Sequence, residues 1–201
     1  AELLKGKGYA TGHFGKWHLG ALNENPIYSS NGMGFSPPSL HGFDEWFSVH
    51  SAVKTYDPYG TDGLPGGTDD GYAGDDDDNN PYFTQNPDTN NLNGVEYTQP
   101  LFGDTSAYIM DRAIPFMESA VNQGKPFLSC IWFHTPHKDL DASPEDQALY
   151  PNGSDGEKLF YGSITAMDRQ IGRLRAWLRD KGIEENTLLW FTCDNGQTTG
   201  S

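Results

Sequence analysis

The amino-acid sequence predicts an α/β fold in which a mostly parallel sheet is flanked by helices. Two runs of residues, 127–133 and 186–193, are almost wholly apolar, as strands buried on both faces are. An amphipathic helical pattern precedes each run, so helices and strands alternate along the chain. The 201 residues suffice for a sizeable core. The chain begins without a methionine, at the end of a helical pattern, and we expect it to be a partial domain of a longer protein.

Charge and composition narrow the classes of partner. Thirteen basic residues against 28 acidic ones give a formal net charge of −15, which argues against binding to nucleic acid or to an anionic membrane. A small anionic substrate stays open, because a local cationic pocket can oppose the overall field. No apolar stretch reaches the roughly 18 residues of a membrane-spanning helix, so we expect no membrane insertion. No pattern predicts an oligomeric state, and Cys130 and Cys193 are expected to be buried free thiols.

The first fifty residues predict one strand and long loops. Residues 1–9 fit the last turn of a helix, and residues 9–14 fit a short strand that leads into a glycine-rich loop at 15–20. Residues 23–40 are rich in Asn, Ser, Gly and Pro, which predicts a loop. Residues 41–47 predict a compact aromatic turn at the edge of the domain.

Residues 48–100 differ in composition from the rest of the chain. Gly, Asp, Asn, Pro and Tyr dominate and no apolar periodicity is present, so we predict a loop-rich acidic insertion. Four consecutive aspartates at 75–78 raise a calcium-loop hypothesis, but their spacing does not match an EF-hand. A solvated acidic loop is the favoured interpretation.

The second half of the chain predicts two helices. The stripe from Ile109 to Ala120 marks the first, with Asp104 or Thr105 as its N-cap and Pro115 as a kink or a break. The second helix is the clearest in the chain, since apolar residues recur at helical spacing over 160–178 and its last turns carry arginines. A coiled coil is the alternative there, but the pattern is short for one and a glycine ends it.

Polar side chains follow the predicted strands at the ends where parallel sheets bind ligands. Three clusters lie there: Lys16 with His18, His134 with His137, and Asp194 with Asn195. Lys16 and His18 are two residues apart, so on an extended strand they would point to the same side. Three clusters at one edge favour a binding site over chance.

The residue types in these clusters suit a tetrahedral oxyanion ester as substrate. Asp194 and Asn195 offer oxygen ligands to Ca²⁺ or Mg²⁺, although the sequence D-N-G also forms common turns. Lys16 could hold an anionic oxygen, and His18 and His137 could move protons near neutral pH. A structural role is the default interpretation of His137 alone, and His134 is a second-rank candidate because it flanks a strand.

Several motifs resemble those of the sulfatase family. G-Y-A-T-G-H-F-G-K-W-H-L-G, at residues 8–20, resembles the family's second signature. H-G-F-D-E-W-F, D-R-A-I-P-F-M-E, K-P-F-L-S-C-I-W-F-H-T-P-H and N-T-L-L-W-F-T-C-D-N-G resemble later family segments, in the family's order. The resemblance covers about residues 1–22, 41–47 and 96–201. It implies an alkaline-phosphatase-like fold and the hydrolysis of sulfate esters by a formylglycine nucleophile, which suggests a periplasmic or secreted protein.

The resemblance also implies a role for each candidate residue. Lys16 would contact the sulfate and the formylglycine, His18 would assist the formylglycine hydroxyl, and His137 would stand near the leaving-group oxygen. Asp194 and Asn195 would bind the divalent metal, usually calcium, with magnesium as the alternative. The expected partner is a sulfated small molecule or carbohydrate.

The chain departs from the family pattern at the nucleophile. The C/S-x-P-x-R motif that matures to formylglycine is absent from these 201 residues, as are the family's N-terminal pair of metal-binding aspartates and a later lysine. We therefore expect the isolated fragment to be inactive. Two alternatives stay open: a phosphate mono- or diester hydrolase of the same superfamily, and a non-catalytic relative that binds sulfated glycans.

Overall fold

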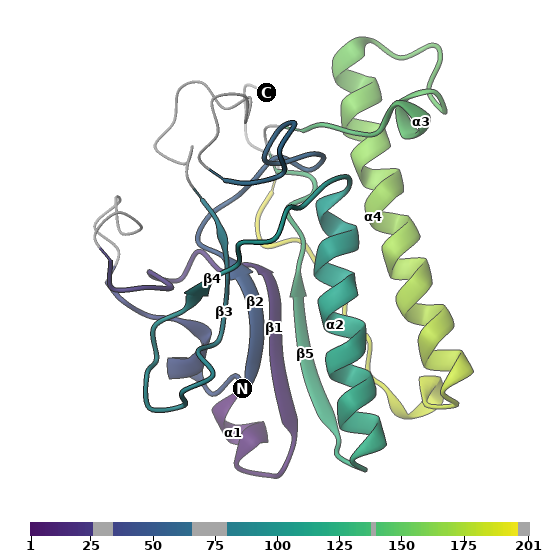
Figure 1. Ribbon diagram of the computed structural model, residues 1–201. Helices are drawn as coiled ribbons and strands as arrows, with labels where there is room; N and C mark the ends of the chain where they lie inside the picture. The colour runs from purple at the N-terminus through teal and green to yellow at the C-terminus, as the bar shows by residue number, and fades with distance from the viewer. Residues whose placement is uncertain (26–33, 66–79, 138–139, 197–201) are drawn as a thin grey trace.

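The computed structural model describes residues 1–25, 34–65, 80–137 and 140–196. A five-stranded sheet forms its centre, and two long helices, α2 (Thr105–Asn122) and α4 (Asp155–Asp180), lie on one side of it (Figure 1). No helix in the described ranges combines the length and the apolar character needed to cross a membrane. The arrangement confirms the predicted α/β class.

The sheet has a parallel half and an antiparallel half. Its order is β4-β3-β2-β1-β5, and β1 pairs in parallel with both of its neighbours, whereas β3 pairs in antiparallel fashion with β2 and β4. The strands are β1 (Ala10–Lys16), β2 (Glu45–Val49), β3 (Tyr82–Thr84), β4 (Val95–Glu96) and β5 (Phe127–Trp132). β1 is therefore the central strand of the parallel half, and it extends two residues beyond its predicted end.

Two of the predicted loops contribute to the sheet. The aromatic turn predicted at 41–47 is a short 3-10 helix, η2 (Pro38–His41), followed by strand β2, whose alternating side chains pack on both faces. The loop-rich insertion predicted at 48–100 also holds the short strands β3 and β4, and it buries Val53, Tyr59 and Tyr82 in the core. The aspartates at 75–78 lie outside the described residues.

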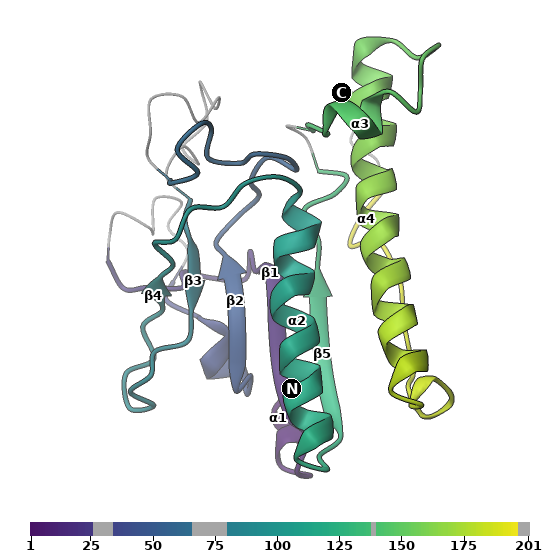
Figure 2. The same ribbon diagram turned by 45° about the vertical axis from the view of Figure 1, so that its right-hand side comes forward.

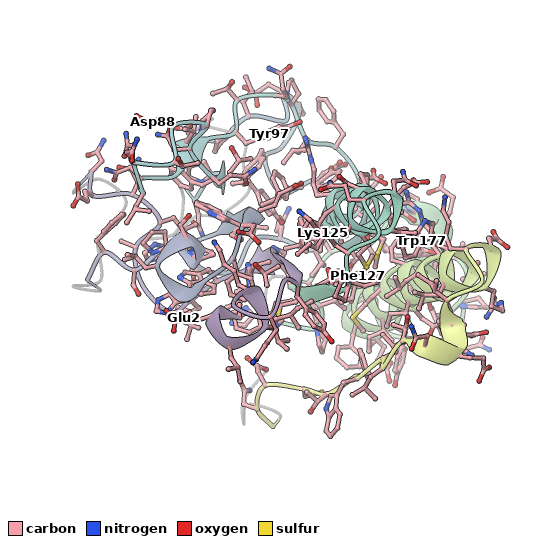
Figure 3. The ribbon with its side chains drawn as sticks, turned by 90° about the horizontal axis from the view of Figure 1, so that it is seen from below. Glu2, Asp88, Tyr97, Lys125, Phe127 and Trp177 are labelled. Atoms are coloured by element: carbon pink, nitrogen blue, oxygen red, sulfur yellow. The ribbon has the colours of Figure 1, made fainter. Side chains whose placement is uncertain are left out.

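Side chains alternate between two hydrophobic clusters on the two faces of the sheet. Toward α2, Phe14 of β1 and Phe47 of β2 join the buried face of the helix, which includes Ile109 and Phe116. The opposite face holds a smaller cluster built on tryptophan and phenylalanine side chains: Trp17, Leu22, Phe43, Trp46 and Phe83. α4 packs on α2 and reaches β5 through Trp177, whose ring lies 6.4 Å from that of Phe127 (Figure 3).

Side-chain caps begin both long helices, and the cap of α2 is one of the two predicted residues. The Asp104 carboxylate accepts a hydrogen bond from the Ala107 N–H at 3.0 Å and caps α2. Pro115 sits inside α2 on its exposed side and does not break the helix. A capping box of Ser154 and Glu157 opens α4. A further short helix, α3 (Pro144–Gln147), packs on α4.

The last predicted strand is absent from the described structure. After the short 3-10 helix η3 (Glu184–Asn186), the chain passes behind the sheet in the view of Figure 1 and behind α4 in that of Figure 2, and it forms no strand. Its apolar side chains are exposed, with Leu188 at 86% and Trp190 at 78%. β5 is consequently a half-buried edge strand. Cys193 is exposed, which contradicts the prediction of a buried thiol at this position.

Candidate active site

The carboxyl ends of β1, β2 and β5 meet at one edge of the sheet. Gly15 pairs with Trp132 of β5, and Lys16 pairs with Val49 of β2. The backbone contact with β2 continues past the end of β1, since the His18 N–H donates to the His50 carbonyl at 2.9 Å. Two of the three predicted clusters therefore lie on neighbouring strands, as expected for parallel pairing.

Gly15 brings β1 and β5 unusually close together immediately before Lys16. Its φ of +110° lies in the region that favours glycine, and a Cβ there would stand 2.0 Å from the Trp132 carbonyl oxygen. No other residue type fits this position without moving β5. The glycine thus fixes the distance between the strand that carries Lys16 and the strand that leads to His134 and His137.

Lys16 and His18 differ in how far they reach into solvent. The Lys16 side chain is half-buried, whereas His18 is exposed. β1 ends at Lys16, and His18 has a φ of +50°, so the argument from strand alternation does not extend to His18. A positive φ at a residue other than glycine stores strain of about 1–3 kcal/mol and is typical of functional sites.

His134 lies in the protein interior directly after β5. Its Nε2 is 2.7 Å from the Tyr82 hydroxyl, and both side chains are almost fully buried. Burial, together with the nearby Lys16 and His137, lowers the pKa of His134 to about 3, because each of them disfavours a positive charge on the ring. His134 is therefore uncharged at neutral pH and does not serve as a proton carrier.

His137 lies on a tight turn that begins at His134. The His137 N–H donates to the His134 carbonyl at 2.7 Å, and the His137 side chain is exposed. The two residues that act electrostatically on the His134 ring are Lys16 and His137. Lys16, at the end of β1, and His137, in the turn after β5, therefore both influence the pKa of this buried imidazole.

Two residues at this edge of the sheet, His50 and Tyr82, were not predicted from the sequence. His50 is buried at the end of β2, and Tyr82 opens β3. β3 runs antiparallel to β2 and pairs Tyr82 with Val49, so the start of β3 lies where the parallel strands end. The available signal for His50 was its position directly after the apolar residues Trp46, Phe47 and Val49, whereas Tyr82 lies within the composition that predicted a loop.

Asp194 and Asn195 lie in an exposed loop near the end of the described residues. Both are exposed, and their hydrogen bonds are made within their own loop: the Asn195 N–H donates to the Asp194 carboxylate at 2.9 Å, and the Asn195 amide donates to the Gly196 carbonyl at 2.8 Å. Within the described ranges, no group of three or more His, Cys, Asp or Glu residues could hold a metal ion. The predicted metal ligation by Asp194 and Asn195 is untested by this arrangement.

His13 belongs to the sheet face opposite α2. Its ring is fully buried between Trp17 and Trp132, with Nδ1 at 2.7 Å from the Ser48 hydroxyl. Burial lowers the pKa of His13 to about 3. We interpret His13 as a structural residue of the signature segment.

The edge as a whole offers a cation and two accessible imidazoles above an uncharged buried layer. A half-buried lysine binds an anionic oxygen more strongly than a lysine in bulk water does. Exposed imidazoles can donate hydrogen bonds to a bound ester or accept them from it. The arrangement suits an anionic ester, even though the chain carries a net charge of −15.

Comparisons with known proteins agree with this chemistry. A family model described as Sulfatase matches residues 1–201. The chain is 32% identical to arylsulfatase G of Rattus norvegicus over 221 residues, which cover 98% of this chain and 35% of that protein. It is 28% identical to the ulvan-active sulfatase of Formosa agariphila over 224 residues, which cover 100% of this chain and 35% of that protein. The chain thus spans about a third of the length of these relatives.

Solved structures share the fold. The structure of Ps i-CgsB in complex with k-i-k-neocarrahexaose superposes with a TM-score of 0.62 at 25% identity, covering 90% of this chain and 36% of that one. The PsFucS1 sulfatase from Pseudoalteromonas sp. superposes with a TM-score of 0.60 at 22% identity, covering 90% of this chain and 34% of that one. The sheet and its helices have the alkaline-phosphatase-like fold of these neighbours. On the match to the family model over its whole length, the chain belongs to the sulfatase family.

Proposed function

We propose that the full-length protein is a sulfuric ester hydrolase and that this chain supplies part of its active site. The proposal rests on three residues at the edge where the parallel strands end: Lys16 is the last residue of β1, His137 lies in the turn after β5, and the His18 N–H bonds to His50, which directly follows β2. Membership of the sulfatase family supports it. The proposal concerns the whole protein, because the chain spans about a third of its relatives' length.

Each residue has a distinct role in this proposal. The Lys16 ammonium binds a sulfate oxygen and stabilises the negative charge that grows as the sulfur is attacked. His137 donates a proton to the oxygen of the leaving alcohol, and His18 accepts the proton of the hydroxyl that attacks the sulfur. Both imidazoles are exposed, so a substrate can reach them.

The resemblance to sulfatases adds two groups to the proposal, a divalent metal and a formylglycine. Asp194 and Asn195 would be two of the metal ligands, but Ca²⁺ takes about six to eight oxygen ligands, and the described residues contribute only this adjacent pair. The donor set is therefore too small for calcium, and no step proposed for this chain depends on the metal. Neither Cys130 nor Cys193 lies in a C/S-x-P-x-R motif, so the nucleophile lies outside residues 1–201.

A sulfated carbohydrate is the proposed class of natural substrate. The named relatives include an ulvan-active sulfatase and the N-acetylgalactosamine-6-sulfatase of Canis lupus familiaris, and a structural neighbour was solved with k-i-k-neocarrahexaose. An aryl sulfate remains the simplest probe, because arylsulfatase G is among the relatives.

Turnover of matched esters by the full-length protein tests the proposal. We expect hydrolysis of an aryl sulfate to exceed hydrolysis of the corresponding aryl phosphate, and Lys16→Ala to lower kcat/KM about 10²–10³-fold because one preorganised partner of the transition state is lost. Lys125→Ala is the matched control, since Lys125 is an exposed lysine at the opposite end of β5 (Figure 3).

Three outcomes would contradict the proposal in different ways. Preference for the phosphate ester would indicate a phosphate hydrolase of the same superfamily. Binding of a sulfated oligosaccharide without turnover would indicate a glycan-binding relative. Equal activity of the Lys16→Ala and Lys125→Ala variants would remove Lys16 from the site.

A further inference from the structure

A single side-chain hydrogen bond spans the parallel half of the sheet at the candidate active site. Tyr82 starts β3 and His134 follows β5, so β2 and β1 lie between the two residues in the sheet. The Tyr82 ring stacks on Phe47 of β2 at 4.3 Å with an angle of 5° between the planes, and its hydroxyl then reaches His134 Nε2 at 2.7 Å. The contact ties the antiparallel half of the sheet to the turn that carries His137.

The pair is buried and uncharged. Tyr82 is 1% exposed and His134 is 2% exposed. A phenol is a better donor than a neutral imidazole N–H, and an unprotonated imidazole nitrogen is a strong acceptor, so the Tyr82 O–H donates to Nε2 and the proton of the ring resides on Nδ1. His134 Nδ1 has no hydrogen-bond partner among the described residues. The Tyr82 hydroxyl is thus the contact that fixes the ring orientation.

The orientation of His134 matters because two site residues depend on its position. His137 is held by the hydrogen bond from its N–H to the His134 carbonyl. Lys16 lies near enough to the His134 ring to act on it electrostatically. A shift of His134 would therefore move the turn that presents His137 and change the surroundings of Lys16 at the same time.

We propose that Tyr82 and His134 form a positioning pair for the candidate active site, in which their hydrogen bond fixes the turn that presents His137 beside Lys16. The inference rests on the sulfatase function proposed for this site. Neither residue touches substrate in this role, and neither transfers a proton.

Three variants of the full-length protein separate positioning from proton transfer. Tyr82→Phe removes only the hydroxyl and should lower kcat for an aryl sulfate about 10–100-fold, as loss of an outer contact to an active-site residue typically does, with little change in KM. His134→Gln places an amide near the position of Nε2, where it can still bond Tyr82, and should retain most of the activity. His134→Asn places its amide near Nδ1, loses Tyr82 and should behave like Tyr82→Phe.

Tyr150→Phe is the matched control for the loss of a tyrosine hydroxyl. The Tyr150 hydroxyl lies 2.6 Å from the Thr165 hydroxyl on α4, away from the residues placed in the site. It should leave kcat unchanged, and its melting temperature shows how much stability such a hydroxyl contributes. Equal kcat for Tyr82→Phe and wild type, or equal loss of activity in His134→Gln and His134→Asn, would overturn the positioning role.

A measurement that does not depend on enzymatic turnover distinguishes a failure of the positioning role from a failure of the proposed sulfatase function. In protein labelled with ¹⁵N-histidine, the ring signals of His137 should move in Tyr82→Phe and stay in place in Tyr150→Phe. Unchanged His137 signals in Tyr82→Phe would overturn the positioning role even in an active enzyme. A wild-type protein that hydrolyses no sulfate ester would instead overturn the proposed function, while a shift of the His137 signals would still support the positioning of the turn.

Discussion

Single residues decide the pH dependence of stability in this chain, and His13 is the clearest case. Its pKa falls from 6.5 to about 3 on folding because burial disfavours the charged ring. Between these values the unfolded chain binds the proton and the folded chain does not, so acidification favours unfolding. The contribution is complete above pH 6.5 and is lost as the pH falls from 6.5 toward 3. His134 acts in the same direction over the same range.

Asp104 opposes the histidines over part of this range. Its pKa rises from 3.8 to about 6, because burial outweighs its hydrogen bonds to the start of α2. Between pH 6 and 3.8 the folded state binds the extra proton, so acidification favours folding at this residue. The pH dependence of the unfolding free energy is therefore the sum of these opposing contributions, and it changes according to which of these residues is replaced.

Replacing His13 should flatten the acid side of the stability profile. His13→Asn keeps an amide within reach of Ser48 but no longer titrates, so the loss of unfolding free energy between pH 7 and pH 5 should shrink by about 2 kcal/mol. Chemical denaturation at both pH values measures this. Ser48→Ala is the control, since it breaks the same hydrogen bond and keeps the ring. If the unfolding free energy of His13→Asn fell with pH as steeply as that of the wild type, the prediction would be wrong. The His13 ring of the folded wild type would then be protonated or hydrated.

At the scale of elements, Pro115 shows how tertiary packing overrides a local signal. α2 runs unbroken from Thr105 to Asn122 because its apolar face, including Ile114 and Phe116 on either side of the proline, packs in the core. The proline has no N–H for the Asp111 carbonyl, one turn earlier. The helix persists at the expense of one internal hydrogen bond.

Pro115→Ala should therefore stabilise the protein. Position 115 is exposed, so the change removes no core contact, and alanine is favoured over proline by up to about 3 kcal/mol inside a helix. We expect a higher melting temperature by calorimetry. Ser119→Ala, at another exposed position of α2, is the control for a general effect of alanine and should change stability by much less. A lower melting temperature for Pro115→Ala would mean that the proline shapes the helix to fit the core.

At the scale of the whole molecule, the segment after α4 exposes a continuous apolar surface. Leu188, Trp190 and Phe191 are 65–86% exposed, and β5 is an edge strand of the sheet within the described residues. Unpaired strand edges and exposed apolar patches both promote association. The 201-residue chain produced by itself should consequently self-associate.

Charged substitutions in this segment should reverse the association. We expect the triple variant Leu188→Lys, Trp190→Lys and Phe191→Lys to increase the monomer fraction in analytical ultracentrifugation. Leu3→Lys is the control, because Leu3 is 77% exposed on the short helix α1 (Glu2–Lys5), away from the β5 edge. A wild-type chain that stays monomeric at high concentration would contradict the prediction.

Local patterns in the sequence were sufficient for several of the helices and strands. The apolar spacing predicted α2, β5 and α4, because amphipathic periodicity depends only on neighbouring residues. The signature at residues 8–20 and the run that ends in His137 indicated the family, which the family model confirms. They also predicted that Lys16 and His137 follow strands that end at the same edge, and β1 and β5 do pair in parallel. These features are encoded within short stretches of chain.

Tertiary structure decided the features that depend on partners distant in the chain. Strands β3 and β4 carry no apolar pattern that stands out, and they form because β2 offers an edge. The segment at 186–193 has the apolar pattern of a buried strand but finds no pairing partner in the described residues, so it stays exposed. The bond between Tyr82 and His134 joins residues 52 positions apart, and only the folded sheet brings them together. A strand is completed by its neighbours, and for that reason sequence periodicity alone does not determine which strands form or what lies beside the active site.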